Sequence, residues 1–413
     1  MLRRFALLTL VALGLAACND SSTRQRNVML AECRLPRVPT AVQCATIEVP
    51  EDRSKPEGRK IPIFAAVLPA NTASPRPDPL VILAGGPGQA ASNLGVFAAR
   101  LAEVRRTRDV VLVDQRGTGR SAPLTCTAFK PVEDDVFDTD PLPRARTCLD
   151  ELRAQGVDPA QYTTTAWIAD LEAMREALGY PQWNLWGGSY GTRVAQEYVR
   201  RHPQRVRAMI LDGVAPPSMI IPLDIWVTRE AAFAAVLAAC AAAESCRKAH
   251  PDIAGVLRAI EAWLGPDGRD VDLIDPATGN TRKLHATFDL VVAALQPLTY
   301  SPEGTSLLPQ MLAAAARGDL APLFAAFPSP SPTQPEAMNA ALLFSVTCAE
   351  DAPRIAPGSE EKMLAPLPTR ILAQRTLSVC GVWPRGSAPA DFATPLTSDV
   401  PTLLFSGGMD PVT

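Results

Sequence analysis

Histidine is scarce in this chain, and positive charge is not concentrated anywhere in it. Only three of the 413 residues are histidine, namely His202, His250 and His285, and none stands beside a cysteine at the spacing of a metal site. We therefore expect no metal ion, and nothing in the sequence indicates another cofactor. The 40 Lys and Arg residues against 43 Asp and Glu give a formal net charge of -3, which leaves no basic patch for nucleic acid.

A hydrophobic run stands at the amino terminus. Residues 1–17 begin with two arginines and continue with an apolar run that is too short to span a bilayer as a mature helix, which is typical of an export signal. Its ending, Leu-Ala-Ala before Cys18, resembles a bacterial lipobox. We expect Cys18 to be lipidated, residues 18–39 to form a tether and amino-terminal segment, and the protein to face the periplasm or the cell exterior from a bacterial membrane. An ordinary cleaved signal is the alternative.

Eight cysteines remain when Cys18 is set aside, and an even number in an exported chain indicates disulfides. They fall into four sequence-local pairs, but eight cysteines allow about 105 connectivities and the sequence does not choose among them. If Cys240 and Cys246 pair, a helix must end near Glu244 or Ser245, because a continuous helix would turn their side chains apart. The candidates are Cys33, Cys44, Cys126, Cys148, Cys240, Cys246, Cys348 and Cys380.

Apolar runs alternate with helical patterns over residues 40–213. This alternation predicts an α/β fold, with a mostly parallel sheet wrapped by helices, preceded by a hairpin of residues 45–49 and 61–68. The runs expected to form buried strands are 80–83, 110–113, 183–186 and 206–211, and the expected helices are 165–178 and 192–201.

The pattern changes at residue 214. Residues 214–398 are rich in alanine and mostly helical, and a strand pattern resumes only at 401–405. We interpret 214–398 as a helical cap inserted over the catalytic edge of the sheet, with the core resuming over 399–413. The helices expected in the cap are 229–243, 253–264, 286–295 and 306–316.

Ser189 lies in Gly187-Gly188-Ser189-Tyr190-Gly191, between a predicted strand and a predicted helix. A G-x-S-x-G pattern at such a junction forces the serine into a strained turn that lifts its hydroxyl above the sheet edge, and the small Gly187 and Gly191 permit that turn. A glycine-rich turn with a chance serine is the alternative. The strand and helix on either side favour a nucleophile.

Glycines also follow two other features of the predicted sheet. Residues 84–88, Ala-Gly-Gly-Pro-Gly, come directly after a buried strand, where backbone N–H groups can form an oxyanion hole, although a plain tight turn has the same composition. Residues 114–121, Asp-Gln-Arg-Gly-Thr-Gly-Arg-Ser, follow the next strand. We interpret them as a structural loop that Arg116 and the surrounding acids hold in place.

Together with Gly-Gly-Met-Asp-Pro-Val-Thr at 407–413, these motifs resemble the α/β-hydrolase serine exopeptidases, in particular the tripeptidyl aminopeptidase and prolyl aminopeptidase relatives. The resemblance implies the α/β-hydrolase fold, with Ser189 as nucleophile and Asp410 as the acid of the triad. It implies the backbone N–H groups of Tyr190 and Gly86 as oxyanion donors.

The resemblance extends over residues 40–413 and includes the cysteines of the cap, which are similar to those of a secreted tripeptidyl-aminopeptidase-like branch. We expect Cys240 to pair with Cys246, and Cys348 with Cys380. Ala84 stands where prolyl aminopeptidases usually have histidine, which argues against close prolyl specificity.

The general base is not assigned by this resemblance, because the superfamily order is Ser, Asp, His and no histidine follows Asp410. His202 lies at the far end of the predicted elbow helix and is interpreted as structural, and His250 and His285 as polar residues of the cap surface. We expect the 413 residues to be an incomplete gene product whose continuation supplies the histidine. This chain alone should then be nearly inert, since loss of the histidine costs a serine triad a factor on the order of 10⁶ in kcat.

Three functions compete. The first is a lipid-anchored serine exopeptidase that removes short amino-terminal pieces from peptides, the second an esterase of the same fold, and the third a non-catalytic lipoprotein scaffold. A peptidase needs acidic groups to hold the substrate's terminal ammonium, and Glu350 and Asp351 are candidates for this role. A solvated acidic loop is the alternative interpretation of these two residues.

Overall fold

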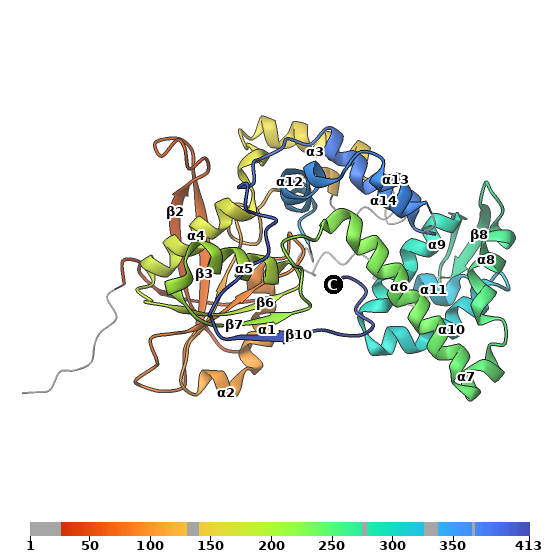
Figure 1. The fold of residues 1–413 in the computed structure, drawn as a ribbon, viewed down its shortest axis with the longest axis horizontal. Helices are drawn as coiled ribbons and strands as arrows, with labels where there is room; N and C mark the ends of the chain where they lie inside the picture. Colours follow the sequence, from red (N-terminus) through yellow and green to blue (C-terminus); the bar gives the residue numbers. More distant parts are fainter. Residues whose placement is uncertain (1–25, 130–139, 275–278, 326–337, 366–367) are drawn as a thin grey trace, which may run out of the picture.

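The computed structural model describes residues 26–129, 140–274, 279–325, 338–365 and 368–413. In this part of the chain an eight-stranded sheet has the strand order β1-β2-β3-β5-β4-β6-β7-β10 (Figure 1). Strands β1, β2, β3 and β5 pair antiparallel, and every pair from β5 through β10 is parallel. The strands are β1 (Ala31–Cys33), β2 (Val42–Pro50), β3 (Lys60–Leu68), β4 (Leu80–Leu83), β5 (Val110–Val113), β6 (Trp183–Gly188), β7 (Val206–Asp212) and β10 (Thr402–Phe405).

Helices cover both faces of the sheet, and the strand residues alternate between them. Val81 and Val111 lie in an apolar cluster with residues of α3, α4 and α5, whereas Leu80 and Val110 lie in a second cluster with residues of η1 and α1. Successive side chains of a strand point to opposite faces, so a strand covered on both sides has to be apolar throughout. These helices are η1 (Ala91–Leu94), α1 (Gly95–Arg100), α2 (Ala102–Arg105), α3 (Leu142–Ala154), α4 (Thr164–Ala177) and α5 (Tyr190–Arg201).

A buried ion pair fixes the loop that follows β5. The Arg116 guanidinium and the Asp170 carboxylate of α4 are fully buried and 2.6 Å apart, and Arg116 also donates to the carbonyl oxygen of Glu51 at 2.8 Å. Additional hydrogen bonds to the charged groups of an ion pair allow the two charges to remain in an interior without water. The loop is therefore structural, as its sequence indicated.

The cap is formed by the chain between β7 and β10. In Figure 1 its helices α6 to α11 lie beside the sheet, α12 lies above the sheet, and α13 and α14 lie toward α9. Its elements are α6 (Ile221–Ala242), α7 (Glu244–Ala249), η5 (Ile253–Gly255), α8 (Val256–Leu264), β8 (Arg269–Ile274), β9 (Thr281–Ala286), α9 (Phe288–Leu295), η6 (Gln296–Tyr300), α10 (Pro302–Ala315), α11 (Ala321–Ala325), α12 (Ala340–Glu350), η7 (Ala352–Arg354), α13 (Ser359–Leu364), α14 (Arg370–Ser378) and η8 (Val379–Gly381).

The apolar residues of the cap fall into three clusters, one of which joins α6 and α9 to α14 through Leu223, Val292 and Leu372. Residues between Phe233 and Phe324 form an apolar cluster of their own, and we call this part the distal lobe. By contrast, Leu342 and Val346 of α12 lie in the same cluster as the sheet. The distal lobe also contains the antiparallel hairpin β8–β9, which the mostly helical pattern did not predict.

Helix α6 is longer than its sequence pattern predicted, because it begins at Ile221 and not at Arg229. Pro222 stands in its first turn, where the missing N–H has no helical partner to lose. By length and apolar composition alone α6 could cross a membrane. Trp226 and Phe233 are nevertheless buried within the cap.

The eight described cysteines form four bonds between sequence neighbours: Cys33–Cys44, Cys126–Cys148, Cys240–Cys246 and Cys348–Cys380. Helix α6 ends at Ala242 and α7 begins at Glu244, so the chain turns between Cys240 and Cys246.

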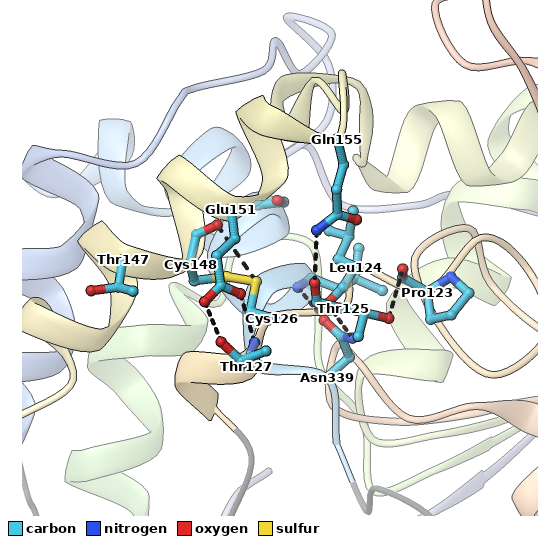
Figure 2. The surroundings of a disulfide bond; sticks show 12 residues. Pro123, Leu124, Thr125, Cys126, Thr127, Thr147, Cys148, Glu151, Gln155 and Asn339 are labelled. Carbon is cyan, nitrogen blue, oxygen red and sulfur yellow. Dashed lines mark hydrogen bonds between the residues drawn. A yellow bond between two sulfur atoms is a disulfide. The ribbon is translucent and has the colours of Figure 1, made fainter.

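Figure 2 shows the surroundings of the Cys126–Cys148 bond, which ties the segment after β5 to α3. Beside it the Asn339 side chain donates to the carbonyl oxygen of Leu124 at 3.0 Å and accepts from the Leu342 N–H at 2.9 Å. Asn339 is therefore the N-cap of α12 and also its attachment to the sheet core.

Strand β10 is one of the two edge strands of the described sheet. It pairs parallel with β7, with Leu403 opposite Ile210 and Phe405 opposite Asp212. The side chains of Leu403, Leu404 and Phe405 are exposed. The strand leads directly into the loop that carries Asp410.

Candidate active site

Ser189 occupies a strained turn between β6 and α5. Its backbone has φ 52° and ψ −124°, a region that a residue with a side chain seldom adopts. Its N–H donates to the carbonyl oxygen of Asp212 at the end of β7, at 2.9 Å. The serine therefore stands at the carboxyl edge of the sheet, where its hydroxyl borders a cavity.

Two glycines make this turn possible, because backbone atoms fill the space around them. A Cβ added at Gly187 would lie 2.3 Å from the carbonyl oxygen of Gly191, and one added at Gly191 would lie 2.2 Å from that of Leu83. Both distances are far inside van der Waals contact. Helix α5 is thus packed directly onto the end of β4.

The turn after β4 lies against the nucleophile. An added Cβ at Gly85 would be 3.3 Å from the Ser189 Cβ and 3.7 Å from its Oγ. The Gly85 N–H donates to the Gln89 side chain at 3.3 Å, so that group is already paired. Gly86 follows with φ 110°, which glycine adopts readily.

The two predicted oxyanion donors adjoin the cavity wall without lining it. Gly86 follows the lining residue Gly85, and Tyr190 follows Ser189. Tyr190 is the first residue of α5, and N–H groups of the first helical turn have no acceptor within the helix. The positive end of the helix dipole adds to their attraction for an oxyanion. Their role as donors stays a prediction.

Asp410 approaches the elbow from the loop after β10. Its Oδ1 accepts from the Val412 and Thr413 N–H groups at 2.8 and 3.0 Å, and its Oδ2 from the Thr413 hydroxyl at 2.6 Å. An added Cβ at Gly213 would lie 3.2 Å from the Asp410 Oδ2 and 4.0 Å from the Ser189 backbone nitrogen. The sheet therefore brings the two predicted triad members to one edge, although they are far apart in the sequence.

A cavity of about 1310 Å³ opens above Ser189. The sheet core contributes apolar side chains, including Phe97 and Trp186, and the cap contributes residues 299–302, 305 and 306. Among its lining residues none is basic, and the only charged ones are Asp212 and Asp410. The cavity is thus apolar with a negative edge.

Asp212 is a charged residue of the cavity to which the sequence analysis gave no functional role. It ends β7, opposite Gly188 on one side and Phe405 on the other, and its side chain is exposed. Its carboxylate forms no ion pair with a described residue. The available signal was its position, since a polar residue directly after a parallel strand stands at the ligand-binding edge of such a sheet.

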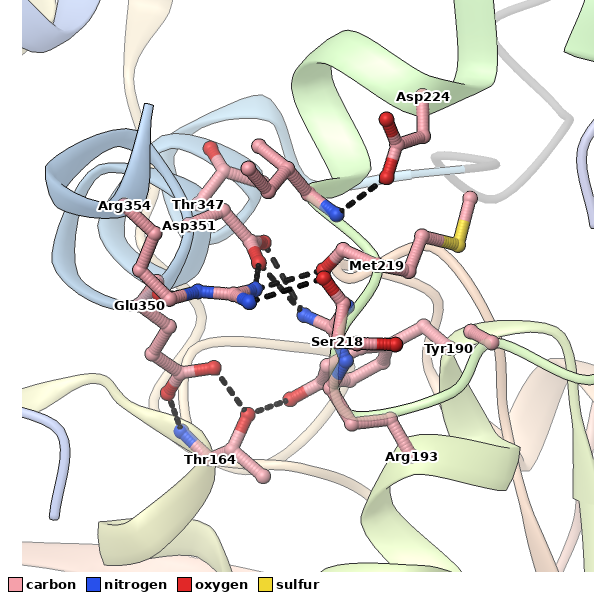
Figure 3. Close-up of polar contacts among 12 residues, drawn as sticks. Thr164, Tyr190, Arg193, Ser218, Met219, Asp224, Thr347, Glu350, Asp351 and Arg354 are labelled. Carbon is pink, nitrogen blue, oxygen red and sulfur yellow. Dashed lines mark hydrogen bonds and ion pairs between the residues drawn. The ribbon is translucent and has the colours of Figure 1, made fainter. Parts of the chain in front are cut away.

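The structure corrects the expectation for Glu350 and Asp351. Neither lines the cavity and neither lies in a solvated loop, because both are buried at the carboxyl end of α12. Asp351 pairs with Arg193 at 2.9 Å and with Arg354 at 2.5 Å (Figure 3). Glu350 accepts from the Thr164 N–H at 2.5 Å and from its hydroxyl at 2.7 Å. Carboxylates that are satisfied in this way are not available to a substrate's ammonium.

None of the three histidines lines the cavity. His202 ends α5 and packs its ring against Tyr198, with 5.1 Å between ring centroids. His285 of β9 contacts the Asp270 carboxylate at 2.7 Å in the distal lobe, and this hydrogen bond raises the pKa of His285. Within the described residues, no group of three or more His, Cys, Asp or Glu is placed to hold a metal ion. Cys18, the predicted lipidation site, lies outside the described residues.

A sequence profile of the α/β-hydrolase fold matches residues 78–247. The chain is 32% identical to a tripeptidyl aminopeptidase of Streptomyces lividans over 44% of its own length, and 31% identical to the serine protease Hip1 of Mycobacterium bovis, also over 44%. It is 33% identical to a proline iminopeptidase of Neisseria meningitidis over 33% of its length. These matches span 37%, 38% and 32% of the three relatives.

We expect the substitution Gly191→Ala to lower the free energy of unfolding by about 3 kcal/mol or more, because the new methyl group has to push α5 away from β4. Gly188→Ala is the matched control, since an added Cβ there meets nothing within 4 Å. It should change stability by about 1 kcal/mol or less. Urea unfolding followed by tryptophan fluorescence measures both. Equal stability of the two variants would contradict this account of the elbow.

Proposed function

Because this chain has the α/β-hydrolase fold and its relatives are serine peptidases of that superfamily, we propose that it is a serine hydrolase that removes short amino-terminal pieces from peptides. One observation carries the proposal: Ser189 stands in a strained elbow that opens into the cavity, and Asp410 lies beside it.

The proposed chemistry is acyl transfer through the serine. The Ser189 hydroxyl attacks the substrate carbonyl, its proton passes to a general base, and N–H groups at the start of α5 and in the turn after β4 stabilise the oxyanion. The base then protonates the leaving amine, and water releases the acyl group from Ser189 by the same steps. Asp410 would orient the base, which in this superfamily is a histidine. His202, His250 and His285 do not line the cavity, so none of them is assigned this role.

We expect Ser189→Ala to abolish labelling of the full-length protein by a fluorophosphonate probe, which reacts only with an activated serine. Ser92→Ala is a suitable control, because the Ser92 hydroxyl is buried and bonded to Asp114 at 3.0 Å. Labelling that persists in Ser189→Ala would place the nucleophile elsewhere. A full-length wild-type protein that never labels would favour the non-catalytic scaffold.

The negative edge of the cavity supports a substrate with a free amino group. Asp212 is exposed, borders Ser189 through the pairing of β6 with β7, and has no cation among the cavity residues to neutralise it. We propose that its carboxylate receives the substrate's terminal ammonium, the role that Glu350 and Asp351 are too buried to play. A charge-assisted hydrogen bond of this kind contributes about 1.5–3 kcal/mol.

We expect Asp212→Asn to raise KM about tenfold for chromogenic peptides with a free α-amino group, and to leave KM unchanged for the same peptides after acetylation. Asp272→Asn, which alters an exposed carboxylate of β8 outside the cavity, is the matched control. An equal change on free and acetylated peptides would exclude ammonium binding by Asp212.

The apolar wall of the cavity supports an esterase as the second candidate. Phe97 and Trp186 contact each other edge to face beside the nucleophile, and such surfaces accept acyl chains. The acetylated substrates distinguish the two candidates. An esterase would hydrolyse simple esters faster than any peptide and would be insensitive to Asp212→Asn.

We also propose that the protein is exported and anchored to a bacterial membrane through a lipid on Cys18. The amino-terminal sequence supports this, and so do the disulfides, because such bonds persist in oxidising compartments. Mass spectrometry of the mature protein should find a lipidated Cys18 as its first residue. A Cys18→Ala variant released from the membrane fraction would agree, and an unmodified terminus at another residue would contradict the anchor.

A further inference from the structure

We propose that Glu350 and Thr164 are positioning residues for the nucleophile elbow, acting through the hydroxyl group of Tyr190 (Figure 3). This inference rests on the proposed function, because it concerns the same serine. It gives the buried acid of the cap a role that neither the sequence nor the cavity indicated.

A continuous chain of hydrogen bonds connects the cap to the elbow. The Gln115 side-chain amide donates to the Tyr190 hydroxyl at 3.2 Å, and the oxygen atoms of Tyr190 and Thr164 are 2.6 Å apart. The Thr164 hydroxyl contacts Glu350 Oε2 at 2.7 Å. Each of these side chains is buried, so none of the bonds is exchanged with bulk water. The chain joins four segments that are remote in sequence.

The direction of donation along this series of hydrogen bonds depends on whether Glu350 is protonated. When Glu350 is ionised it only accepts, so the Thr164 hydroxyl donates to Glu350 and the Tyr190 hydroxyl donates to Thr164. Gln115 then donates to Tyr190, and both hydroxyl protons in the chain have an acceptor. Tyr190 is held from both sides.

When Glu350 carries a proton, this direction reverses. Glu350 donates to the Thr164 hydroxyl, which in turn donates to Tyr190, while Gln115 still donates to the same Tyr190 oxygen. The Tyr190 proton then has no acceptor within the chain. A buried donor without a partner is costly, so the protonated state holds the Tyr190 ring less firmly.

Tyr190 connects the protonation state of Glu350 to the catalytic serine. It directly follows Ser189, and its backbone N–H is the predicted oxyanion donor. Its side chain is 1% exposed and has no freedom except what its hydrogen bonds and packing allow. A loosened ring loosens the peptide unit next to the nucleophile, and misplacement of an oxyanion donor lowers kcat and not substrate affinity.

The charged groups around Glu350 come from two elements. Asp351 of the same segment disfavours its ionised form, and Arg193 of α5 favours it, while Arg354 donates to its backbone oxygen at 2.9 Å. Burial is the largest influence and, with Asp351, raises the pKa of Glu350 from 4.5 to about 8. Since the folded-state pKa is the higher one, ionisation destabilises the fold as pH rises between these values. Because the ionised form of Glu350 holds Tyr190 from both sides, the turn at Ser189 becomes better ordered as the pH rises toward about 8.

The first experiment compares variants of the full-length protein on a chromogenic substrate. We expect Tyr190→Phe and Thr164→Val each to lower kcat about tenfold at unchanged KM, and Thr164→Ser to restore it. Tyr198→Phe is the matched control. Tyr198 lies on the same helix as Tyr190 but far from Ser189, and the substitution removes a buried tyrosine hydroxyl that donates to Glu172 of α4. Melting temperatures should fall similarly in Tyr190→Phe and Tyr198→Phe. Equal kcat in these two variants would overturn the proposal.

The second experiment tests whether the protonation state of Glu350 controls kcat. In Glu350→Gln the amide oxygen accepts from the Thr164 N–H in place of Oε1, and the amide nitrogen donates to the Thr164 hydroxyl, so the variant imitates the protonated state. Deprotonation of the general base raises kcat in both proteins, but the wild-type kcat should show a further rise through about pH 8 that the variant lacks. A variant that keeps this further rise would refute the role of Glu350. If the wild-type protein neither labels with fluorophosphonate nor hydrolyses substrate, the proposed function fails, whereas an active protein with unaltered variants contradicts the positioning role alone.

Discussion

Helix α5 and strand β4 meet at Gly191 so closely that no side chain fits between them. This contact sets the position of the first turn of α5 above the sheet, and Ser189 takes up the positive φ that the connection requires. The turn after β4 and the ends of β7 and β10 are then neighbours of the serine, because parallel strands end at one edge. The cavity lies where the ends of β4, β7 and β10 meet the end of β6.

Much of this arrangement could be predicted because its causes are local. The run 80–83 has to be apolar throughout, since both faces of β4 are covered, and the observed strand has the predicted bounds. The elbow was recognisable because its glycines are required by contacts within the motif and with the adjoining strand. The break between α6 and α7 was predicted for the case that Cys240 and Cys246 pair, as they do.

The parts that sequence reasoning missed depend on distant partners. Glu350 bonds a residue 186 positions away and Asp351 one 158 positions away, and only these partners make burial of the two acids possible. The hairpin β8–β9 was missed because it is largely exposed, with Leu273 as the buried residue of its first strand. Asp212 stood at a predictable strand end, but its importance comes from a cavity wall built by other segments.

The placement of the cross-links has a mechanical consequence. Each disulfide joins residues at most 32 positions apart, and within the described cysteines none connects the distal lobe to the sheet. The disulfides therefore stiffen the sheet region and the distal lobe separately, and none of them crosses the boundary between the two. Residues 299–302, 305 and 306 form the cap side of the cavity. Among the described cysteines, no disulfide holds this cap wall to the sheet wall of the cavity, so their spacing depends on non-covalent contacts and on the connecting chain segments.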